Sequence, residues 1–255
     1  MLTKYGSAAL LFSVLIACAP AYAESSSSQT ADWNGLYAGV AVGMSKGTVD
    51  PAANSIANGY FITTDPGQVD PEGGKKLEET MVNGGVLVGM NRQYGNIVAG
   101  IEVDLTRSAF NEQYTSGNIA YITVPASTFN LTTKVTSDWL ASVRPRLGYA
   151  HKDGLYFASA GPAMTRMNYD FYFADTAGPA FTRVTESAFK LGWSAGVGYE
   201  HKLADDWSLK AEYLYTRFTN IVKTSSQLSN AANDGFNHKV NYTLNNVRVA
   251  LVKSF

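Results

Sequence analysis

The sequence is poor in the residues that build disulfide scaffolds and metal centres. It contains one cysteine, Cys18, and three histidines among 255 residues. One cysteine cannot form an intramolecular disulfide, and a zinc site needs several Cys or His side chains that converge on one point. The histidines, His151, His201 and His238, are too widely spaced along the predicted fold to converge. We therefore expect no metal site and no cofactor.

Long apolar runs and an excess of one charge are also missing. After residue 23, no segment approaches the ~18 apolar residues of a transmembrane helix. The formal net charge is −1, a balance that argues against nucleic acid as a partner. The sequence shows no motif typical of phosphate binding or catalysis, and no histidine is predicted to have a Ser or acidic partner close by on the same face, so we expect no enzyme.

The N-terminus has the features of an export signal. Lys4 precedes an apolar stretch over residues 8–17, and Ala21-Tyr22-Ala23 forms an A-x-A cleavage site. We predict a cleaved signal peptide at 1–23, a polar arm at 24–32 and one domain at 33–255. Residues 15–18, Leu-Ile-Ala-Cys, offer the alternative of lipidation at Cys18.

The last ten residues alternate strictly between two faces. Val247, Val249 and Leu251 lie on one face with Phe255, whereas Arg248 lies on the other. Alternation with a period of two is typical of a β-strand with different surroundings on its two sides. Such a strand needs a partner, because an open sheet edge promotes aggregation. Pairing with the first strand would close the sheet into a barrel.

Eight strands can be traced through the chain, and long and short connections alternate between them. The long connections cover about 45–79, 107–133, 168–184 and 219–237, and the short ones join the strands at the opposite end. No helix is expected after the leader. Pro145 falls inside one strand, where proline removes a ladder hydrogen bond, and predicts a bulge there. The predicted strands cover about 33–44, 80–91, 97–106, 134–150, 155–167, 187–202, 207–218 and 238–255.

Aromatic spacing indicates that the apolar face is the outer one. Trp139 and Tyr149 lie ten residues apart on one face, as do Phe189 and Tyr199. Ten residues at ~3.3 Å each, tilted by ~40°, rise about 25 Å, which is the height of the lipid-facing band between two aromatic girdles. We assign Trp207 to a girdle as well. The same alternation puts Val135 outside and Asp138 inside. A soluble, lipocalin-like barrel would be apolar within and polar outside.

Charged residues share the opposite face with many glycines, as a narrow lumen would require. Glu102 and Arg144 lie at about the same distance from the short-turn end of neighbouring strands, and Glu212 and Arg248 are candidates for a second pair. We expect a salt-bridged network in the lumen, because unpaired buried charges are costly; the alternative is scattered, solvated charges. The network comprises Glu102, Asp104, Arg144, Arg146, Lys210, Glu212 and Arg248.

Several of these strands resemble a known family. The segments WNGLYAGVAVGM, VLVGMNRQYGNIVAGIEVDL, SVRPRLGYA and GWSAGVGYEHKLADDWSLKAEYLYTRF, with the terminal aromatic residue, are similar to the alpha-proteobacterial outer-membrane immunogenic proteins, which are opacity-like eight-stranded barrels. The chain departs from their pattern at Pro145. The resemblance implies an all-β, eight-stranded antiparallel transmembrane barrel with four long outer loops and three short periplasmic turns, located in the bacterial outer membrane.

These expectations favour a structural, surface-exposed membrane protein that contributes to envelope integrity and to host or environment interaction. Side chains just fill an eight-stranded barrel, which disfavours a wide channel. Two alternatives remain: a small porin, or binding of hemin or a host surface through the loop aromatics. We expect a monomer whose partners are outer-membrane lipid and, through Phe255, the barrel-assembly machinery. The loop aromatics are Tyr60, Phe61, Tyr114, Tyr121 and Phe129.

Overall fold

The computed structural model describes residues 30–62, 64–204 and 206–255. The predicted signal peptide 1–23, Cys18 within it, and residues 24–29 of the polar arm lie outside these described residues. No helix in the described part of the chain is long and apolar enough to cross a membrane. The elements are β1 (Gly35–Ile56), α1 (Asp65–Gly73), β2 (Leu77–Tyr94), β3 (Ile97–Thr115), β4 (Ile119–Ala120), β5 (Thr128–His151), β6 (Gly154–Asp175), β7 (Phe181–Lys202), β8 (Trp207–Leu228) and β9 (Ala231–Ser254).

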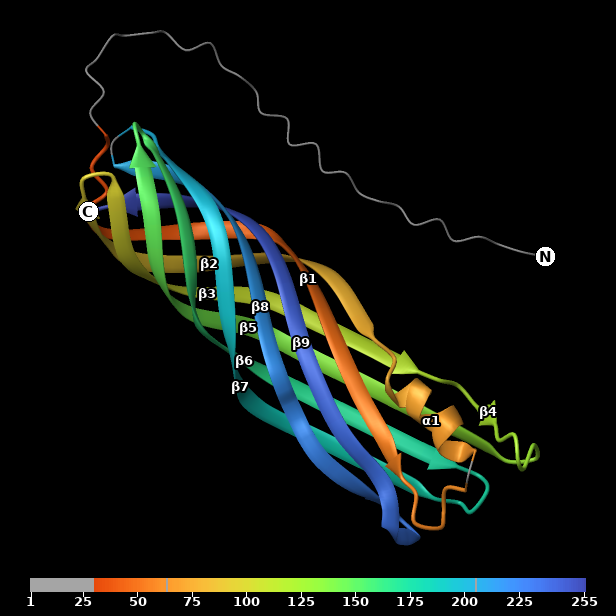
Figure 1. Ribbon diagram of the computed structural model, residues 1–255. Helices are drawn as coiled ribbons and strands as arrows, with labels where there is room; N and C mark the ends of the chain where they lie inside the picture. The colour runs from red at the N-terminus through yellow and green to blue at the C-terminus, as the bar shows by residue number, and fades with distance from the viewer. Residues whose placement is uncertain (1–29, 63, 205) are drawn as a thin grey trace, which may run out of the picture.

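Eight long antiparallel strands form a closed ring (Figure 1). The order is β3-β2-β1-β9-β8-β7-β6-β5, and β3 pairs with β5 to complete the circle. The last strand pairs with the first, from Tyr37↔Ser254 to Ile56↔Gly235. β4 is a two-residue strand on the outer part of β5. The predicted eight-stranded antiparallel barrel is therefore confirmed.

The strands extend well beyond their predicted ends. β1, β6, β7 and β8 each have 22 residues, and β5 and β9 have 24. Two connections that we expected to be long are consequently tight: β6 and β7 are joined across 176–180, and β8 and β9 across 229–230. The longer connections are 57–76 and 116–127. The outer strand segments are rich in Asn, Ser, Thr and Gly, which made them look like loops, but their inward positions are apolar or aromatic.

A helix occurs where none was expected. α1 contains Pro66 in its first turn and Pro71 inside it, so its intrinsic helix propensity is low. Tertiary contacts hold it instead. Val69 is fully buried, and the carboxylate of Asp70 accepts a hydrogen bond from the backbone N–H of Ser55 at 2.8 Å. The helix lies beside the outer end of β1 (Figure 1).

The ring is continuous only in its half nearest the short turns. β2 and β3 pair only from Gly84↔Arg107 to Tyr94↔Ile97, and β7 and β8 only from Trp193↔Arg217 to Lys202↔Ser208. Beyond these limits, one sheet consists of β8, β9, β1 and β2, and the other of β3, β5, β6 and β7. The outer half is therefore a β-sandwich of two four-stranded sheets.

Bulges occur where the barrel becomes a sandwich. Register shifts interrupt β3 between Arg107 and Phe110, β5 between Ser137 and Leu140, and β8 between Phe218 and Val222. A bulge bends its strand and increases the local twist, which allows the sheets to separate. The bulge in β5 also corrects two predicted orientations: Val135 is buried within the sandwich, and Asp138 is exposed.

The bulge expected at Pro145 is absent. The pairing of β5 with β6 keeps one register on either side of it, from Ser142↔Ala163 to Arg146↔Ser159, although no pairs are formed between these two. Pro162 lies in the same interruption on β6, so both strands lack an N–H there. Gly161 closes the gap, because a Cβ at this position would lie 2.1 Å from the carbonyl oxygen of Val143.

Candidate functional site

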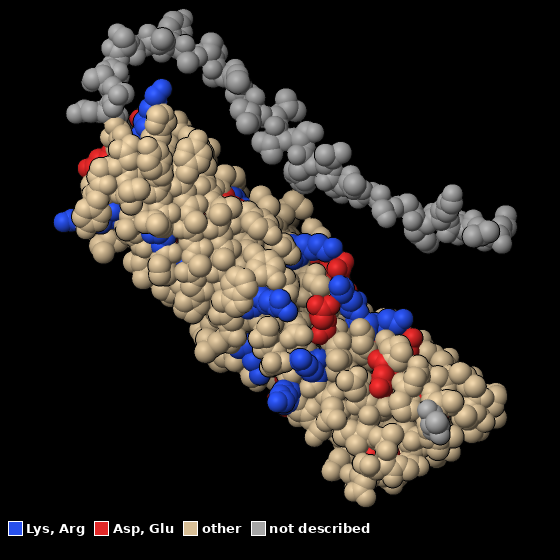
Figure 2. Space-filling model, viewed as in Figure 1, with Lys and Arg blue, Asp and Glu red and all other residues tan. Residues whose placement is uncertain are grey.

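The outward face of the continuous barrel is apolar. Its exposed side chains include Val40 and Val42 of β1, Val86 and Val88 of β2, and Leu191 of β7. Figure 2 shows a surface that is largely free of charge along this half, with Lys, Arg, Asp and Glu gathered across the middle of the molecule. Exposed apolar area of this extent has a physical explanation if hydrocarbon covers it.

Aromatic side chains mark two levels of this apolar face. Trp139 contacts Phe189, with ring centroids 5.9 Å apart, near the point where the two sheets separate. Near the short turns, Tyr149 is paired with Tyr156, whose ring centroid lies 4.9 Å from that of Tyr199. Trp207 is at the same end, under the Lys253 ammonium at 5.3 Å. All five side chains assigned to girdles are thus on the outward face, and Trp139 is half-buried there.

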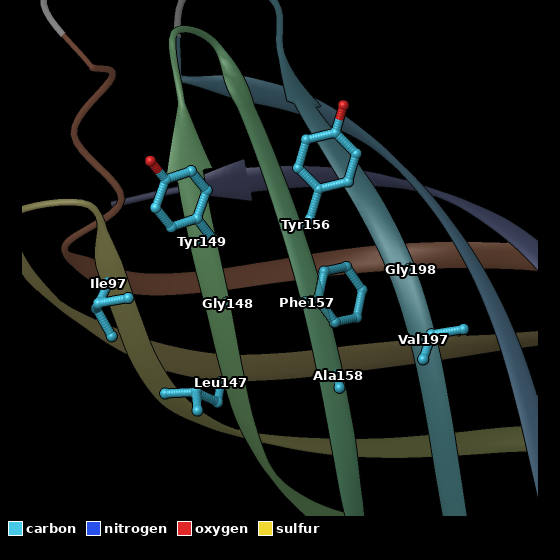
Figure 3. Close-up of a pocket in the computed structure, with 9 residues that line it drawn as sticks. All are labelled: Ile97, Leu147, Gly148, Tyr149, Tyr156, Phe157, Ala158, Val197 and Gly198. Atoms are coloured by element: carbon cyan, nitrogen blue, oxygen red, sulfur yellow. The ribbon is translucent and has the colours of Figure 1, made fainter.

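Tyr149 and Tyr156 border a shallow apolar hollow on the outer wall (Figure 3). Its floor contains Gly148 and Gly198, and Leu147 and Val197 form its sides. The ring of Phe157 fills the lumen behind this floor, because a Cβ on Gly198 would lie 2.4 Å from the Phe157 ring. The hollow is therefore a feature of the lipid-facing surface, and the wall behind it is closed.

The described N-terminal residues close the lumen at the short-turn end. The backbone N–H of Ala31 donates to the carbonyl of Lys152 at 2.9 Å, and that of Trp33 donates to the side-chain oxygen of Gln93 at 2.8 Å. The indole of Trp33 is 3% exposed and packs against Val98. Leu155, Phe157 and Ala150 complete this apolar layer.

Above this layer, eight ionisable side chains fill the barrel. The four acids are Glu102, Asp104, Glu200 and Glu212, and the four bases are Arg144, Arg146, Lys210 and Arg248. None is more than 4% exposed. The structure therefore brings together all seven residues proposed for the network and adds Glu200. Equal numbers of positive and negative charges keep the layer neutral.

Glu102 lies at the centre of the network. Its carboxylate is within 2.6–3.5 Å of nitrogens of all four bases, and Lys210 contacts both of its oxygens at 2.8 and 2.6 Å. Tyr37 donates to the same carboxylate at 2.9 Å and accepts from Arg146 at 3.0 Å. Asp104 contacts Arg144 at 2.7 Å and Arg248 at 2.9 Å.

The two predicted pairs are direct cross-strand neighbours. Glu102 lies opposite Arg144, with 2.9 Å between Oε1 and Nη2, and Glu212 lies opposite Arg248, with 2.8 Å between Oε2 and Nη2. Gly43 makes room for Arg248, because a Cβ on this glycine would lie 2.7 Å from the Arg248 Cβ. The glycine-rich inward face is what allows large charged side chains to fit a narrow cylinder.

Glu200 is a member of the network that was not predicted from the sequence. Glu200 follows Gly196 and Gly198 on the glycine face of β7, and this position was the available signal. Its carboxylate contacts Arg146 at 3.0 Å and accepts a hydrogen bond from Ser208 at 2.5 Å. Charge balance also indicates an eighth member, because without Glu200 four bases would face only three acids in a buried layer.

Polar and then aromatic layers continue above the charges. Asn83 donates to Ser45 at 2.6 Å and to Asn246 at 3.1 Å. Beyond them, the sandwich core contains rings such as Phe110 and Tyr242, whose centroids are 5.4 Å apart. The charged layer is therefore closed on both sides by packed side chains. The other aromatic residues of this core are Phe61, Tyr121, Phe129, Tyr169, Phe171, Phe173, Phe218 and Phe236.

The five loop aromatics proposed to stack on a ligand pack within the protein instead. Phe61, Tyr121 and Phe129 are buried in the sandwich core. The hydroxyls of Tyr60 and Tyr121 donate to the carboxylate of Asp175 at 2.7 and 2.9 Å, and burial raises the pKa of both phenols. Tyr114 donates to Glu72 of α1.

The prediction that no histidine has a serine partner close by is wrong. His238 has a serine partner: its Nε2 lies 3.0 Å from Ser226 Oγ, and its Nδ1 lies 3.0 Å from the Tyr169 hydroxyl. The contact escaped sequence analysis because 219–237 was taken for a loop, whereas β8 and β9 form a hairpin there. His238 and Ser226 are buried, at 2% and 7% exposure, and burial lowers the pKa of His238 to about 4. The His238 ring packs against the rings of Phe171 and Phe236, with centroids 4.6 and 6.2 Å away.

His151 and His201 are exposed beside the short turns. The structure shows no group of three or more His, Cys, Asp or Glu side chains in its described ranges that would hold a metal ion.

Comparisons with known proteins agree on one class. The model of a family described as an outer membrane protein beta-barrel domain matches residues 8–244. The 31 kDa outer-membrane immunogenic protein of Brucella melitensis is 27% identical over 196 residues, which cover 73% of this chain and 72% of that protein. The 25 kDa outer-membrane immunogenic protein of Brucella ovis is 29% identical over 140 residues, covering 55% and 57%. Among solved structures, the outer membrane protease OmpT from Escherichia coli aligns with a TM-score of 0.48 and 10% identity, covering 91% of this chain and 99% of that one.

Proposed function

Because the chain belongs to the outer membrane protein beta-barrel family, and the protein lies in the bacterial outer membrane, we propose that it is a closed structural barrel that carries a rigid protein module on the cell surface. The continuous half of the barrel spans the membrane, and Trp139, Phe189, Tyr149, Tyr199 and Trp207 form its two aromatic girdles. The sandwich with α1 and the outer connections stands above the membrane.

The filled cross-section carries this proposal. A channel requires a connected aqueous path, but three kinds of layer occupy the lumen in turn: apolar packing around Trp33, the neutral network around Glu102, and the aromatic core around Phe236. An eight-stranded cylinder leaves just enough interior space for side chains. The small-porin alternative would need all three layers to move.

Single-channel recording in planar bilayers tests the closed state. We expect no steady openings from the full-length protein under conditions in which a large trimeric porin, added to the same membrane, gives regular conductance steps. Steady nanosiemens-scale openings from the barrel would overturn the proposal. Insertion is verified in parallel by the shift in gel mobility between unheated and heated samples.

A structural role predicts an envelope defect when the protein is absent. We propose that the barrel contributes to envelope integrity and that its outer module meets the host or the environment, as the immunogenic relatives suggest. A deletion strain should take up more of a hydrophobic fluorescent dye, and the wild-type gene should restore the barrier. Unchanged dye uptake would remove this part of the proposal.

The C-terminal residue is proposed to be read by the barrel-assembly machinery. Phe255 is 76% exposed, and its backbone N–H donates to the carbonyl of Leu36 at 2.8 Å, so its ring is available at the end of the closing strand. Phe255→Ala should lower the amount of assembled barrel in cells while leaving refolding in detergent unchanged. Equal assembly of the two proteins in cells would contradict the proposal.

A further inference from the structure

Two arginines and four aromatic residues form a patch on the outward faces of neighbouring strands. We call this set the arginine–aromatic patch: Trp139 of β5, Arg166 of β6, Phe189 and Trp193 of β7, and Tyr215 and Arg217 of β8. The Arg166 guanidinium lies 6.0 Å from the centroid of Phe189, which also contacts Trp139. Trp193 is the cross-strand partner of Arg217, and its ring centroid is 5.3 Å from that of Tyr215.

The patch lies where the apolar face ends. On β7, Leu191 lies within the patch, between Phe189 and Trp193, and is 75% exposed. Val197, which is 59% exposed, continues the apolar face from the patch toward the short turns. On the other side, the outward positions of β6 are Asn168 and Asp170. Figure 2 shows the corresponding change along the molecule, from an almost uncharged surface to one rich in charged side chains. Both arginines are therefore at the height of the lipid headgroups.

Neither arginine has a carboxylate partner among the described residues. The Arg166 guanidinium hydrogen-bonds the hydroxyl of Ser187 at 3.3–3.4 Å and lies over the Phe189 ring. Arg217 makes no ion pair with the residues that the structure describes. Asp138, next to Trp139, pairs with neither. Two basic residues farther from the lipid do have a carboxylate partner: Arg183 pairs with Asp170 at 2.6 Å, and Lys46 pairs with Glu78 at 3.0 Å.

We infer that the arginine–aromatic patch binds phosphate groups of an anionic lipid in the outer leaflet. A guanidinium presents a planar fork of donors that matches phosphate oxygens, and Trp and Tyr favour the headgroup layer because one part of the ring system is apolar and the other polar. Lipid phosphate at this height supplies the negative partner that no carboxylate of the described residues provides to Arg166 or Arg217. The inference depends on the membrane location and is independent of whether the lumen conducts.

Native mass spectrometry of the full-length barrel in phosphatidylcholine nanodiscs tests the inference. The probes are diphosphorylated lipid A and the same lipid with both phosphates removed. The test variant is Arg166→Gln/Arg217→Gln, and the matched control is Lys223→Gln/Lys239→Gln. The control removes the same charge from two exposed residues that lie opposite each other on β8 and β9, farther above the membrane.

The wild type should retain the phosphorylated lipid in preference to the dephosphorylated one. Each basic residue near the membrane surface contributes about a fivefold attraction, so the double arginine variant should bind about thirtyfold more weakly. The lysine control should stay within about twofold of the wild type, and free inorganic phosphate should not compete. If the double arginine variant fails to fold, the single variants Arg166→Gln and Arg217→Gln should each lose about fivefold.

Equal losses in the arginine and lysine variants would show general charge attraction and overturn the assignment. Equal retention of the two lipid probes would overturn it as well, because recognition would then not involve phosphate. Competition by inorganic phosphate would identify a site for a soluble anion instead of a lipid.

Discussion

Removing the charge of Glu102 should destabilise the barrel more than any surface substitution. Glu102→Gln preserves the size of the side chain but leaves four buried bases facing three acids. The wild-type carboxylate accepts hydrogen bonds from Arg144 at 2.9 Å and from Lys210 at 2.8 and 2.6 Å, and its relative exposure is 1%. Breaking a buried ion pair by removing one partner costs about 3–5 kcal/mol, because the other charge stays buried without compensation.

Equilibrium urea unfolding in lipid vesicles, followed by tryptophan fluorescence, measures this loss. With a urea dependence of about 1–3 kcal/mol per M, the midpoint should fall by about 1–5 M. Asp170→Asn is the matched control, because it removes the partner of Arg183 in an ion pair whose arginine side chain is 64% exposed. An exposed pair contributes about 0–1 kcal/mol, so this midpoint should hardly move.

A second variant distinguishes lost neutrality from lost contacts. Glu102→Gln/Lys210→Met removes one acid and one base and restores the balance of charge. Its destabilisation should be smaller than the sum of the two single effects, because the single variants each leave an unpaired charge. The reasoning fails if Glu102→Gln is no less stable than Asp170→Asn, or if the double variant is fully additive.

Three further predictions concern the sandwich, the packing of the lumen and the outer connections. Burial lowers the pKa of His238 in the folded protein to about 4, whereas its ordinary value is 6.5, so between these pH values the unfolded chain binds an additional proton. The contribution of neutral His238 to stability is complete above pH 6.5 and is lost as the pH falls toward 4, about 3 kcal/mol in all. Urea midpoints measured from pH 7 to pH 4.5 should therefore decline less in His238→Gln than in the wild type. Gly43→Ala should cost about 1–3 kcal/mol of unfolding free energy in the same assay, because its Cβ would lie 2.3 Å from the Val247 carbonyl oxygen. Gly84→Ala should be tolerated, because the nearest atom to its Cβ would be 3.6 Å away, and equal effects of the two variants would contradict this packing. Protease treatment of intact cells, read by mass spectrometry, should cut within 57–76 and 116–127 and spare the 229–230 turn; cleavage at that turn alone would refute the strand boundaries.

Sequence periodicity predicted the continuous half of the barrel, which we propose to span the membrane. In β3, Ile101, Val103 and Leu105 alternate with Glu102 and Asp104, and the structure places the first set outside and the second inside. Lipid and lumen make opposite demands on alternate residues there, so the pattern is strong. The pairing of the last strand with the first also followed from this pattern.

The errors occurred where the pattern depends on distant contacts. A one-residue bulge in β5 reverses Val135 and Asp138, and no local signal marks its position. α1 was missed because its prolines and glycines predict a loop, and contacts of Val69 with the sandwich core stabilise it. The serine beside His238 is visible only once β8 and β9 are known to pair across two residues.

The residue types on both faces of β6 change along the strand, and this explains why its faces were hard to assign from the sequence. On its inward face, Ser159 and Thr165 are followed by Tyr169 and Phe171; on its outward face, Met164 is followed by Arg166. In the half that we propose to span the membrane, lipid covers the outward side chains, so the lumen is free to hold charges that neutralise one another. Above it, water covers the outside, so the hydrophobic effect requires an apolar interior, and rings replace ions between the sheets.

The reversal along β6 falls between Met164 and Tyr169, level with the bulge in β5 and close to Trp139 and Arg166. Polarity, backbone geometry and aromatic position therefore identify one plane across the molecule. Each observable has a different physical origin: solvation, strand bending and interfacial preference. We therefore predict that the outer membrane boundary lies at this plane. A spin label at Met164 should then be shielded from a water-soluble relaxation agent and accessible to oxygen, whereas one at Asn168 should show the opposite accessibility.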